Sequence, residues 1–437
     1  MNKQRFKEEV LSAIDDRSEE LIKLGEELYR LPELGYREKK TSRVFADRLE
    51  SLGLEVSRGL ALTGVMADLP ARERPLLVIM GELDAVVCPG HPQADPETGA
   101  AHACGHHAQM TSVVGAAMGL TAAGAQRHLG GGVRFMGVPA EEYVEIEYRR
   151  RLREEGKIEF MGGKQEMIRL GYLDGIQAAL MMHLGQAPDE IQFRTGGTSN
   201  GFVGKFVRYL GREAHAGSAP HQGVNALSAA MLGIMGVNAL RETFRDGDYV
   251  RIHPIISQGG NLVNIVPADV RMETYVRGRT LEVISEANSR VNRALRAGAM
   301  AVGGEVEIDD LPGYLPRRLH EPLEDLVAEN AREILGSDRV EVHRDHMAGS
   351  SDFGDVTHLM PGSHPTVAAA SGRAHSEDYR VADPRLAYVE SGKILAAAAV
   401  DLLWDGASLL KEQAGAFTPA FSVESYLETW RQMAGRG

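Results

Sequence analysis

Residues 102–107 hold one cysteine and three histidines, in the order His-Ala-Cys-Gly-His-His. Thiolate and imidazole groups are the ligands that borderline metals such as zinc prefer. The apolar residues of the next segment, 110–117, recur at helical spacing, which places Cys104 and His106 in the loop that begins a helix. Free backbone N–H groups at such a position also stabilise a thiolate. The cluster therefore predicts a metal site.

Acidic or histidine side chains follow each of four predicted strands. These strands are expected from continuous apolar runs, typical of a parallel sheet buried on both faces, at residues 75–80, 133–138, 178–182 and 366–370. The polar residues that follow them are, in turn, Glu82 with Asp84, Glu141 with Glu142, His183, and His375. Because open α/β sheets bind ligands beyond the carboxyl ends of their strands, we expect these side chains to meet near Cys104.

The order of the predicted elements indicates the fold class. Helical segments fall between the four strands, so the main fold is expected to be α/β with a mostly parallel sheet. From about residue 196 the pattern changes to strand–helix–strand–strand–helix–strand, which is the ferredoxin-like order. We therefore expect a catalytic domain in two parts, residues 1–195 and 311–437, interrupted by a smaller ferredoxin-like α+β domain at 196–310.

The remaining segments carry weaker signals. Amphipathic spacing predicts packing helices at residues 5–30 and 41–52. Residues 143–157 are highly charged with mixed signs, which predicts an exposed helix or flap with a solvated face. Gly162-Gly-Lys164 is too short to be a phosphate-binding loop. Residues 401–437 contain no motif that indicates a function.

Charge and cysteine content limit the expected partners and compartment. The formal net charge of −13 argues against nucleic acid and anionic membrane surfaces. No apolar run approaches the roughly 20 residues of a membrane span, and the first residues lack an apolar signal core. Two cysteines, Cys88 and Cys104, make no disulfide framework, so a reducing, cytoplasmic location is expected. A disulfide between them would consume the thiol of the expected metal ligand.

Five motifs that occur in order along the chain resemble those of one enzyme family. They are His102-Ala-Cys104-Gly-His106, Pro139-Ala-Glu141-Glu142, the Asp174-Gly…His183 segment, Gly211-Arg-Glu-Ala-His215-Ala-Gly and Gly259-Gly-Asn…Asn264-Ile-Val-Pro267. Together they resemble the metallo-aminoacylase and carboxypeptidase-G family, and within it the amidohydrolases that cleave N-acyl amino acids. Substrates of that branch include auxin conjugates, hippurate and p-aminobenzoyl-glutamate. The resemblance covers nearly the whole chain.

The resemblance implies a site with two divalent ions, zinc or manganese with cobalt as a further option. Carried over position by position, the metal ligands would be Cys104, His106, Glu142, His183 and His375. Cys104 would stand where other branches place a bridging aspartate, a role that a thiolate can fill for zinc. Glu141 would be the general base, and Asp84 would hold a histidine ligand in its working tautomer.

The resemblance also implies a homodimer formed through the inserted domain, which would act as a lid. His215 would reach the active site of the partner subunit and stabilise the tetrahedral oxyanion there. Arg277, with Asn264 before it at the family's spacing, would bind the carboxylate of the amino-acid half of the substrate.

Several positions depart from the family's pattern. The residue after His106 is commonly acidic or an amide, and here it is His107. Glu82 stands where some branches carry a metal-binding histidine, and residues 143–157 replace a short glycine-rich link. Ser351 and Asp352 fall where the family has a Ser/Asp pair that lines the pocket. The roles of His107, Glu82 and residues 143–157 therefore stay open, whereas Ser351 and Asp352 match the family and are expected to line the pocket.

The predicted function is metal-dependent hydrolysis of the amide bond of an N-acyl amino acid or a small dipeptide. A dipeptidase or aminopeptidase on the same fold is the alternative among metal enzymes. A catalytically silent metal-binding scaffold is a second alternative, against which stands the presence of Glu141. A hydrolase with Cys104 as nucleophile is a third, but it gives no reason for Glu142, His183 and His375 to gather at strand ends.

Overall fold

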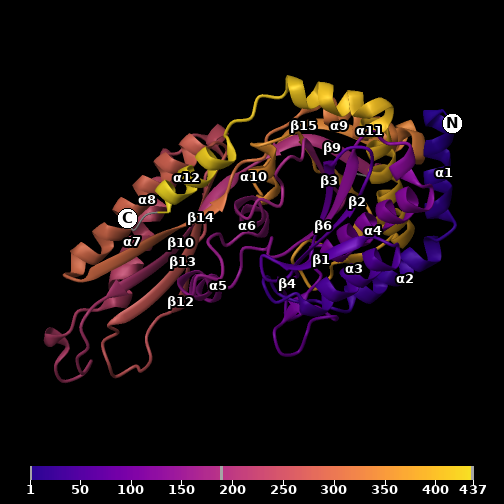
Figure 1. Ribbon diagram of the computed structural model, residues 1–437. Coiled ribbons are helices and arrows are strands. Elements are labelled where there is room, and N and C mark those ends of the chain that lie inside the picture. Colours follow the sequence, from indigo (N-terminus) through magenta and orange to yellow (C-terminus); the bar gives the residue numbers. More distant parts are fainter. Residues whose placement is uncertain (1, 188–189, 435–437) are drawn as a thin grey trace.

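The computed structural model describes residues 2–187 and 190–434, in which the chain forms two bodies around separate sheets (Figure 1). The larger body contains a six-stranded mixed sheet. Its strands, in spatial order, are β1 (Glu55–Leu60), β2 (Gly64–Leu69), β6 (Gly132–Val138), β3 (Pro75–Glu82), β7 (Ala178–Met181) and β16 (Gly362–Ser363). The last four are parallel to one another, whereas β1, β2 and β6 pair antiparallel. The expected α/β class is confirmed, but the sheet is mixed rather than mostly parallel.

The helix that follows the Cys104 loop, α4 (His106–Ala122), is buried along nearly its whole length. It packs between β3 and an outer layer of helices, which are α1 (Lys3–Asp15), α2 (Ser18–Tyr29), α3 (Lys39–Ser51) and α11 (Ser391–Ala416). A Cβ at Gly119 would lie 2.6 Å from the Ile14 side chain, so the small residue is what lets α1 approach. The helix expected at 5–30 is divided at residues 16–17 into α1 and α2, which lets both turn an apolar face to α4.

A second sheet of four strands lies beside the first and corrects one strand prediction. Its spatial order is β15 (Val340–Met347), β9 (Phe193–Ser199), β17 (Thr366–Val367) and β8 (His183–Leu184). The apolar run 366–370 was expected to extend the main sheet, but its first two residues form β17 of this second sheet, and its last residue begins β18 (Ala370–Ser371), which pairs with β19 (Arg380–Val381). The main sheet instead continues through β16, which is too short to be recognised as an apolar run.

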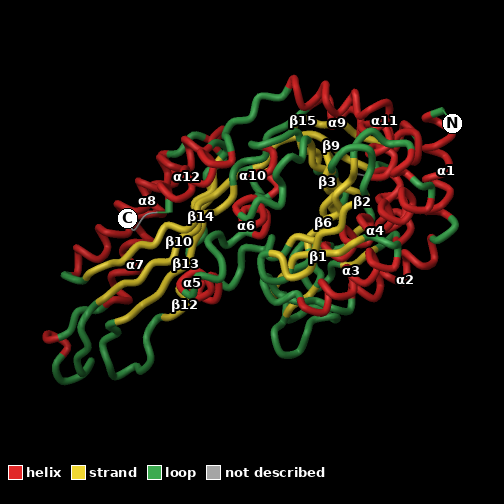
Figure 2. The backbone as a smooth tube through the Cα atoms, viewed as in Figure 1, coloured by secondary structure: helices red, strands yellow, loops and turns green. Residues whose placement is uncertain are grey.

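The smaller body is built on a five-stranded antiparallel sheet. Its strands are β10 (Gly201–Leu210), β11 (Arg251–Ile252), β12 (Ile255–Gln258), β13 (Asp269–Gly278) and β14 (Glu305–Tyr314). The spatial order β11-β13-β10-β14, with β12 also paired to β13, is the ferredoxin-like order. Helices α7 (Ala226–Leu240) and α8 (Leu281–Val302) lie side by side along one face of this sheet (Figure 2). The domain boundaries at 195 and 310 stay a prediction.

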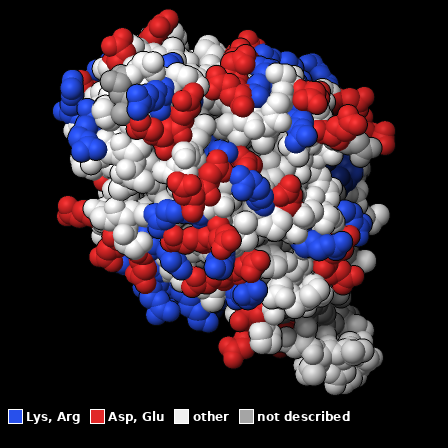
Figure 3. Space-filling model, turned by 90° about the vertical axis from the view of Figure 1, so that its right-hand side faces the viewer, with Lys and Arg blue, Asp and Glu red and all other residues white. Residues whose placement is uncertain are grey.

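Charges of both signs are mixed on one face of the larger body. On the face formed by α1 and α2, acidic and basic side chains are interspersed among uncharged ones (Figure 3). In the described residues, no helix is both long enough and apolar enough to cross a bilayer.

A C-terminal helix, α12 (Val423–Met433), connects the two bodies. The chain leaves α11, crosses the molecule and returns to pack against β14 and α6 (Gly163–Arg169) (Figure 1). Tyr426 and Trp430 are fully buried there, and the hydroxyl of one and the indole N–H of the other donate to Asp355 Oδ1 at 2.8 and 3.0 Å. Asp355 lies in α10 (Phe353–Thr357). These residues were not assigned any role from the sequence.

Replacing Trp430 with alanine tests how much α12 stabilises the protein. Loss of a fully buried indole and of its bond to Asp355 is expected to lower the free energy of unfolding by about 3–5 kcal/mol. Urea unfolding followed by circular dichroism measures the change. Glu428→Ala, at an exposed position of the same helix, is the control and should leave stability nearly unchanged. Equal stability of the Trp430→Ala and Glu428→Ala variants would show that α12 is not part of the folded core.

Candidate metal centre

The turn before α4 directs Cys104 and His106 to one side of the chain. Gly105, the residue between them, has φ +88°, and a Cβ at that position would lie 2.6 Å from the Tyr379 hydroxyl. Glycine is therefore required both by the backbone conformation and by the close packing. The ligand atoms of Cys104, His106 and His183 lie within 4.8 Å of one another. They form the first of three groups that could hold a metal ion.

The second group shares Cys104 with the first. It joins Cys104 to Glu142 and His375, again with all ligand atoms within 4.8 Å. Glu142 Oε1 lies 3.2 Å from His375 Nε2, and the His375 side chain is 53% exposed at the rim of the site. Because the Cys104 thiol belongs to both groups, it could serve as a ligand shared by both.

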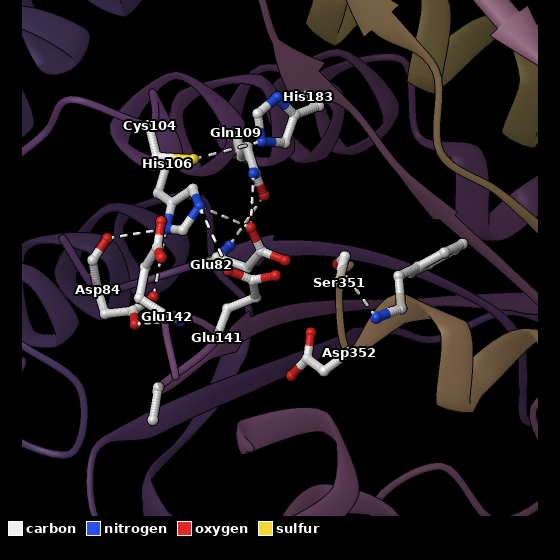
Figure 4. Close-up of polar contacts among 12 residues, drawn as sticks. Glu82, Asp84, Cys104, His106, Gln109, Glu141, Glu142, His183, Ser351 and Asp352 are labelled. Atoms are coloured by element: carbon white, nitrogen blue, oxygen red, sulfur yellow. Dashed lines mark hydrogen bonds and ion pairs between the residues drawn. The ribbon is translucent and has the colours of Figure 1, made fainter. Parts of the chain in front are cut away.

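The rings of buried His106 and partly buried His183 are oriented by hydrogen bonds from Nδ1. His106 Nδ1 lies 2.9 Å from the Asp84 carbonyl oxygen and 3.2 Å from Asp84 Oδ1. His183 Nδ1 lies 2.8 Å from the Leu184 carbonyl oxygen. A carbonyl oxygen can only accept, so Nδ1 carries the proton and Nε2 is left as the ligand atom. Figure 4 shows both rings turned toward the site, with Asp84 behind His106.

These residues fit a divalent metal pair on their own chemistry. His106 Nε2 is fully buried and has no hydrogen-bond partner among the described residues, although it points at other potential ligands. Burial and the Glu142 carboxylate raise the pKa of the Cys104 thiol, but His106 and His183 outweigh them and lower that pKa to about 6. Thiolate is the form that binds zinc. Sulfur, nitrogen and carboxylate ligands in this arrangement suit zinc and tolerate manganese or cobalt.

The third group consists of Glu82, His106 and Glu141. Glu82 Oε2 lies 3.1 Å from His106 Nε2, and Glu141 Oε2 lies 3.9 Å from the same atom. Burial, Glu82 and Glu142 together raise the pKa of Glu141 well above its usual range. Figure 4 shows Glu141 and Glu142 on the same side of their loop, facing His106.

A buried lysine that was not identified from the sequence holds Glu82 in place. Lys164 Nζ lies 2.5 Å from Glu82 Oε1 and also pairs with Asp352, and all three side chains are at most 1% exposed. Burial raises the pKa of Glu82, but Lys164 and His106 outweigh it and hold that pKa well below its usual range. Asp352 was expected to line the pocket; it is instead committed to this ion pair. The two glycines before Lys164 were the available sign of close packing at this segment, because a Cβ at Gly163 would lie 1.6 Å from the Pro139 carbonyl oxygen.

A cavity of about 470 Å³ opens onto the candidate metal ligands. It is lined by Cys104, Glu141, Glu142, His183 and His375, together with residues of the second sheet and of the loop at 350–351. Substrate could therefore reach the expected general base and both ligand groups from one side. Neither Glu82 nor Asp84 lines the cavity, so both lie behind the residues that do.

Besides Asp84, three predicted site residues lie outside both the ligand groups and the cavity lining. His215 is exposed on the loop after β10, where its Nδ1 accepts from Gly217 N and Ser218 N. Asn264 is exposed beside it, and its carbonyl oxygen accepts from Ala216 N at 2.9 Å. Arg277 lies at the end of β13 and donates to Ser350 Oγ at 2.7 Å. Only Arg277 therefore comes near the cavity, because Ser350 lines it.

The charged stretch 143–157 differs from its prediction. It forms α5 (Ile146–Glu154), and Tyr143, Ile146, Arg149 and Leu152 are buried rather than solvated. These four residues recur every third position, an apolar stripe that includes one arginine. That spacing was the available signal, but the many charges around it masked the stripe.

Comparison with known proteins places the chain among amide hydrolases. A family model described as peptidase family M20/M25/M40 matches residues 78–401. The chain is 27% identical over 435 residues to the Xaa-Arg dipeptidase of Mus musculus. That alignment covers 92% of this chain and 90% of the dipeptidase. It is 28% identical over 355 residues to the N-acetylcysteine deacetylase of Bacillus subtilis (strain 168), an alignment that covers 78% of this chain and 86% of the deacetylase. A solved dinuclear metal-binding peptidase of family M20 from Bacillus subtilis shares the fold, with TM-score 0.63, 23% identity, and 89% and 99% covered.

Lys164→Met tests whether this lysine compensates the charge of the site. Removing it leaves Glu82 and Asp352 buried without a cation, which is expected to lower the free energy of unfolding by about 3–5 kcal/mol. Added zinc should then raise the melting temperature of Lys164→Met more than that of the wild type, because a nearby cation replaces the lost charge.

Lys205→Met is the matched control for that experiment. Lys205 is equally buried and pairs with Asp310 in the smaller body, where none of the three ligand groups lies. It should lose stability to a similar extent but show the wild-type response to zinc. Equal zinc responses of the two variants, measured by differential scanning fluorimetry, would show that Lys164 does not act on the metal site.

Proposed function

The chain belongs to peptidase family M20/M25/M40 and is a hydrolase of amide bonds, and from this premise we propose that it cleaves N-acyl amino acids. The observation that carries the proposal is the division of labour between two adjacent glutamates. Both line the cavity, but Glu142 lies with Cys104 and His375, whereas Glu141 lies with Glu82 and His106. One can therefore hold an ion while the other stays free to move a proton.

The proposed site uses five ligands, Cys104, His106, Glu142, His183 and His375, to hold two divalent ions. Ions bound there would lower the pKa of water and polarise the scissile carbonyl. Glu141 accepts the proton of the attacking water and returns it to the leaving amine. Asp84 keeps His106 in the tautomer that presents Nε2, and its other oxygen accepts from Glu142 N at 2.8 Å.

The carboxylate of the amino-acid half is proposed to bind Arg277. Among the described residues this guanidinium makes no ion pair, and its hydrogen bond is to the neutral Ser350 hydroxyl. Its donors therefore remain suited to a carboxylate that enters beside Ser350. Asn264 is proposed to assist from the loop that follows β12.

We propose that the enzyme is a homodimer in which His215 completes the partner's site. His215 is exposed in one chain and lies outside the ligand groups and the cavity lining. Large apolar side chains are exposed on the same body, namely Met231, Met235, Ile255, Leu262 and Val263. A second copy of the chain would cover them. His215 would then stabilise the oxyanion of the tetrahedral intermediate in the partner subunit.

Two further choices remain proposals. A dipeptidase is the second candidate, because the similarity to the Xaa-Arg dipeptidase extends over 92% of the chain, and Asp345 in the cavity lining could bind a positively charged group.

Both cysteines are free in the structure, which supports the expected reducing cytoplasm. Cys104 as a nucleophile is disfavoured by its place in two metal-ligand groups.

Glu141→Gln tests the general base. The variant should keep the metal content of the wild type, while kcat on N-acyl amino acids falls by about 10²–10⁴-fold because proton transfer is lost. A panel of N-acyl amino acids and dipeptides, assayed after chelation and re-supply of zinc, manganese or cobalt, identifies the substrate class. Wild-type activity that survives chelation but not thiol alkylation would instead assign the reaction to Cys104.

Mixing inactive variants tests the dimer. Homodimers of His215→Ala and of Glu141→Gln should each be nearly inactive. If His215 acts on the partner, a mixed dimer holds one intact site, so random subunit exchange should restore about a quarter of wild-type activity. Recovery is followed by the same assay, with sedimentation to show that dimers form. A mixture that stays inactive although subunits exchange would mean that His215 does not act across the dimer.

A further inference from the structure

The two functional glutamates lie on a buried loop that forms neither helix nor strand. Residues 139–142 follow β6, and Glu141 and Glu142 are each 8% exposed. Ala140 has φ +55°, a strained conformation for a residue with a Cβ. A buried backbone without regular structure must find other donors for its carbonyl oxygens. The source of those donors decides how the loop is held.

Two side chains supply donors to three consecutive carbonyl oxygens of this loop. Arg149, fully buried in α5, donates from Nη1 to the Ala140 oxygen at 3.1 Å and from Nη2 to the Glu142 oxygen. Tyr314, at the end of β14, donates its hydroxyl to the Glu141 oxygen. Arg149 Nη1 also donates to the Met161 oxygen at 2.7 Å. We call Arg149 and Tyr314 the carbonyl clamp.

Arg149 has no carboxylate partner among the described residues, which is unusual for a buried cation. Its charge faces main-chain oxygens and the rings of Tyr36 and Tyr143, whose centroids lie 5.5 and 5.8 Å from Cζ. A rigid fork of several donors can bond two carbonyls of one loop at once, which a lysine ammonium does less well. Burial of this guanidinium therefore serves the loop rather than an ion pair.

The loop has an unusual task that explains this arrangement. Along an extended chain, neighbouring side chains point to opposite faces. Here Glu141 and Glu142 both reach ligand groups around His106 and Cys104. The backbone must turn between them, and the turned backbone cannot be held by a neighbouring strand. Hydrogen bonds to the carbonyl oxygens on either side of each Cα fix the turn.

We propose that Arg149 and Tyr314 are positioning residues for amide hydrolysis, which fix the backbone that aims Glu141 at the cavity and Glu142 at the metal ligands. The proposal rests on the function proposed above. It also gives residues 143–157 a role, because α5 is the element that delivers Arg149. The clamp further joins the two bodies, since Tyr314 comes from the five-stranded sheet and Tyr275 of that sheet donates to the Tyr143 oxygen.

Three variants test the clamp: Arg149→Met, Arg149→Lys and Tyr314→Phe. Loss of clamp donors should lower kcat by about 10–100-fold for Arg149→Met with little change in KM, because the acid pair is misplaced by a fraction of an ångström. Arg149→Lys should recover part of this loss, and Tyr314→Phe should show a smaller one. Arg151→Met, at an exposed position of the same helix, is the control and should match the wild type.

Zinc content provides a second readout that needs no substrate. Misplacement of Glu142 should weaken one of two sites, so zinc bound per chain should fall toward one in the clamp variants and stay unchanged in Arg151→Met. If no substrate is turned over even by the wild type, the proposed function fails, while zinc content still decides the clamp. Tyr314→Phe, which removes one oxygen atom, serves if Arg149→Met does not fold. Wild-type kcat and wild-type zinc content in folded Tyr314→Phe and Arg149→Lys would overturn the proposal.

Discussion

Buried negative charge is the constraint on which the rest of the structure depends. Five carboxylates, each at most 8% exposed, surround one site: Glu82, Asp84, Glu141, Glu142 and Asp352. Ionised carboxylates are unstable in a protein interior unless cations or hydrogen-bond donors compensate them. The helices that begin at the site supply that compensation, His106 from α4 and Lys164 from α6. Metal ions would add to it, so the site is built to be stable with its charges in place.

Much of the site could be predicted because the ends of buried strands can be recognised in a sequence. Apolar runs locate β3, β6 and β7, and the carboxyl ends of parallel strands meet at one edge of a sheet. That rule alone brought Glu142 and His183 toward Cys104. The change of element order from about residue 196 likewise predicted the five-stranded sheet, in which buried and partly buried residues of β13 alternate. His215 and Asn264 were recognised by resemblance only, and a single chain does not bring them to the ligands.

The residues that were missed are those whose role depends on a distant partner. Charged side chains are expected at the surface, yet Lys164 and Arg149 are buried because Asp352 and the loop at 139–142 lie opposite them. The glycines before Lys164 and the spacing around Arg149 indicate close packing or burial, but they do not identify those partners. The strand at 362–363 was not predicted for a different reason, because two residues are too few to show a pattern. Long-range pairing, rather than local preference, is what sequence inspection could not supply.

The docking of α12 has a consequence for how the protein is made. Trp430 lies 75 residues after Asp355 along the chain, and Tyr426 lies 71 residues after it. A ribosome therefore completes both bodies before the two donors to this carboxylate emerge. Until then Asp355, three residues from the Asp352 that pairs with Lys164, lacks part of its hydrogen bonding. The support that α12 gives to Asp355 is thus added late in synthesis, and nascent chains halted before residue 426 would carry the candidate ligands without it.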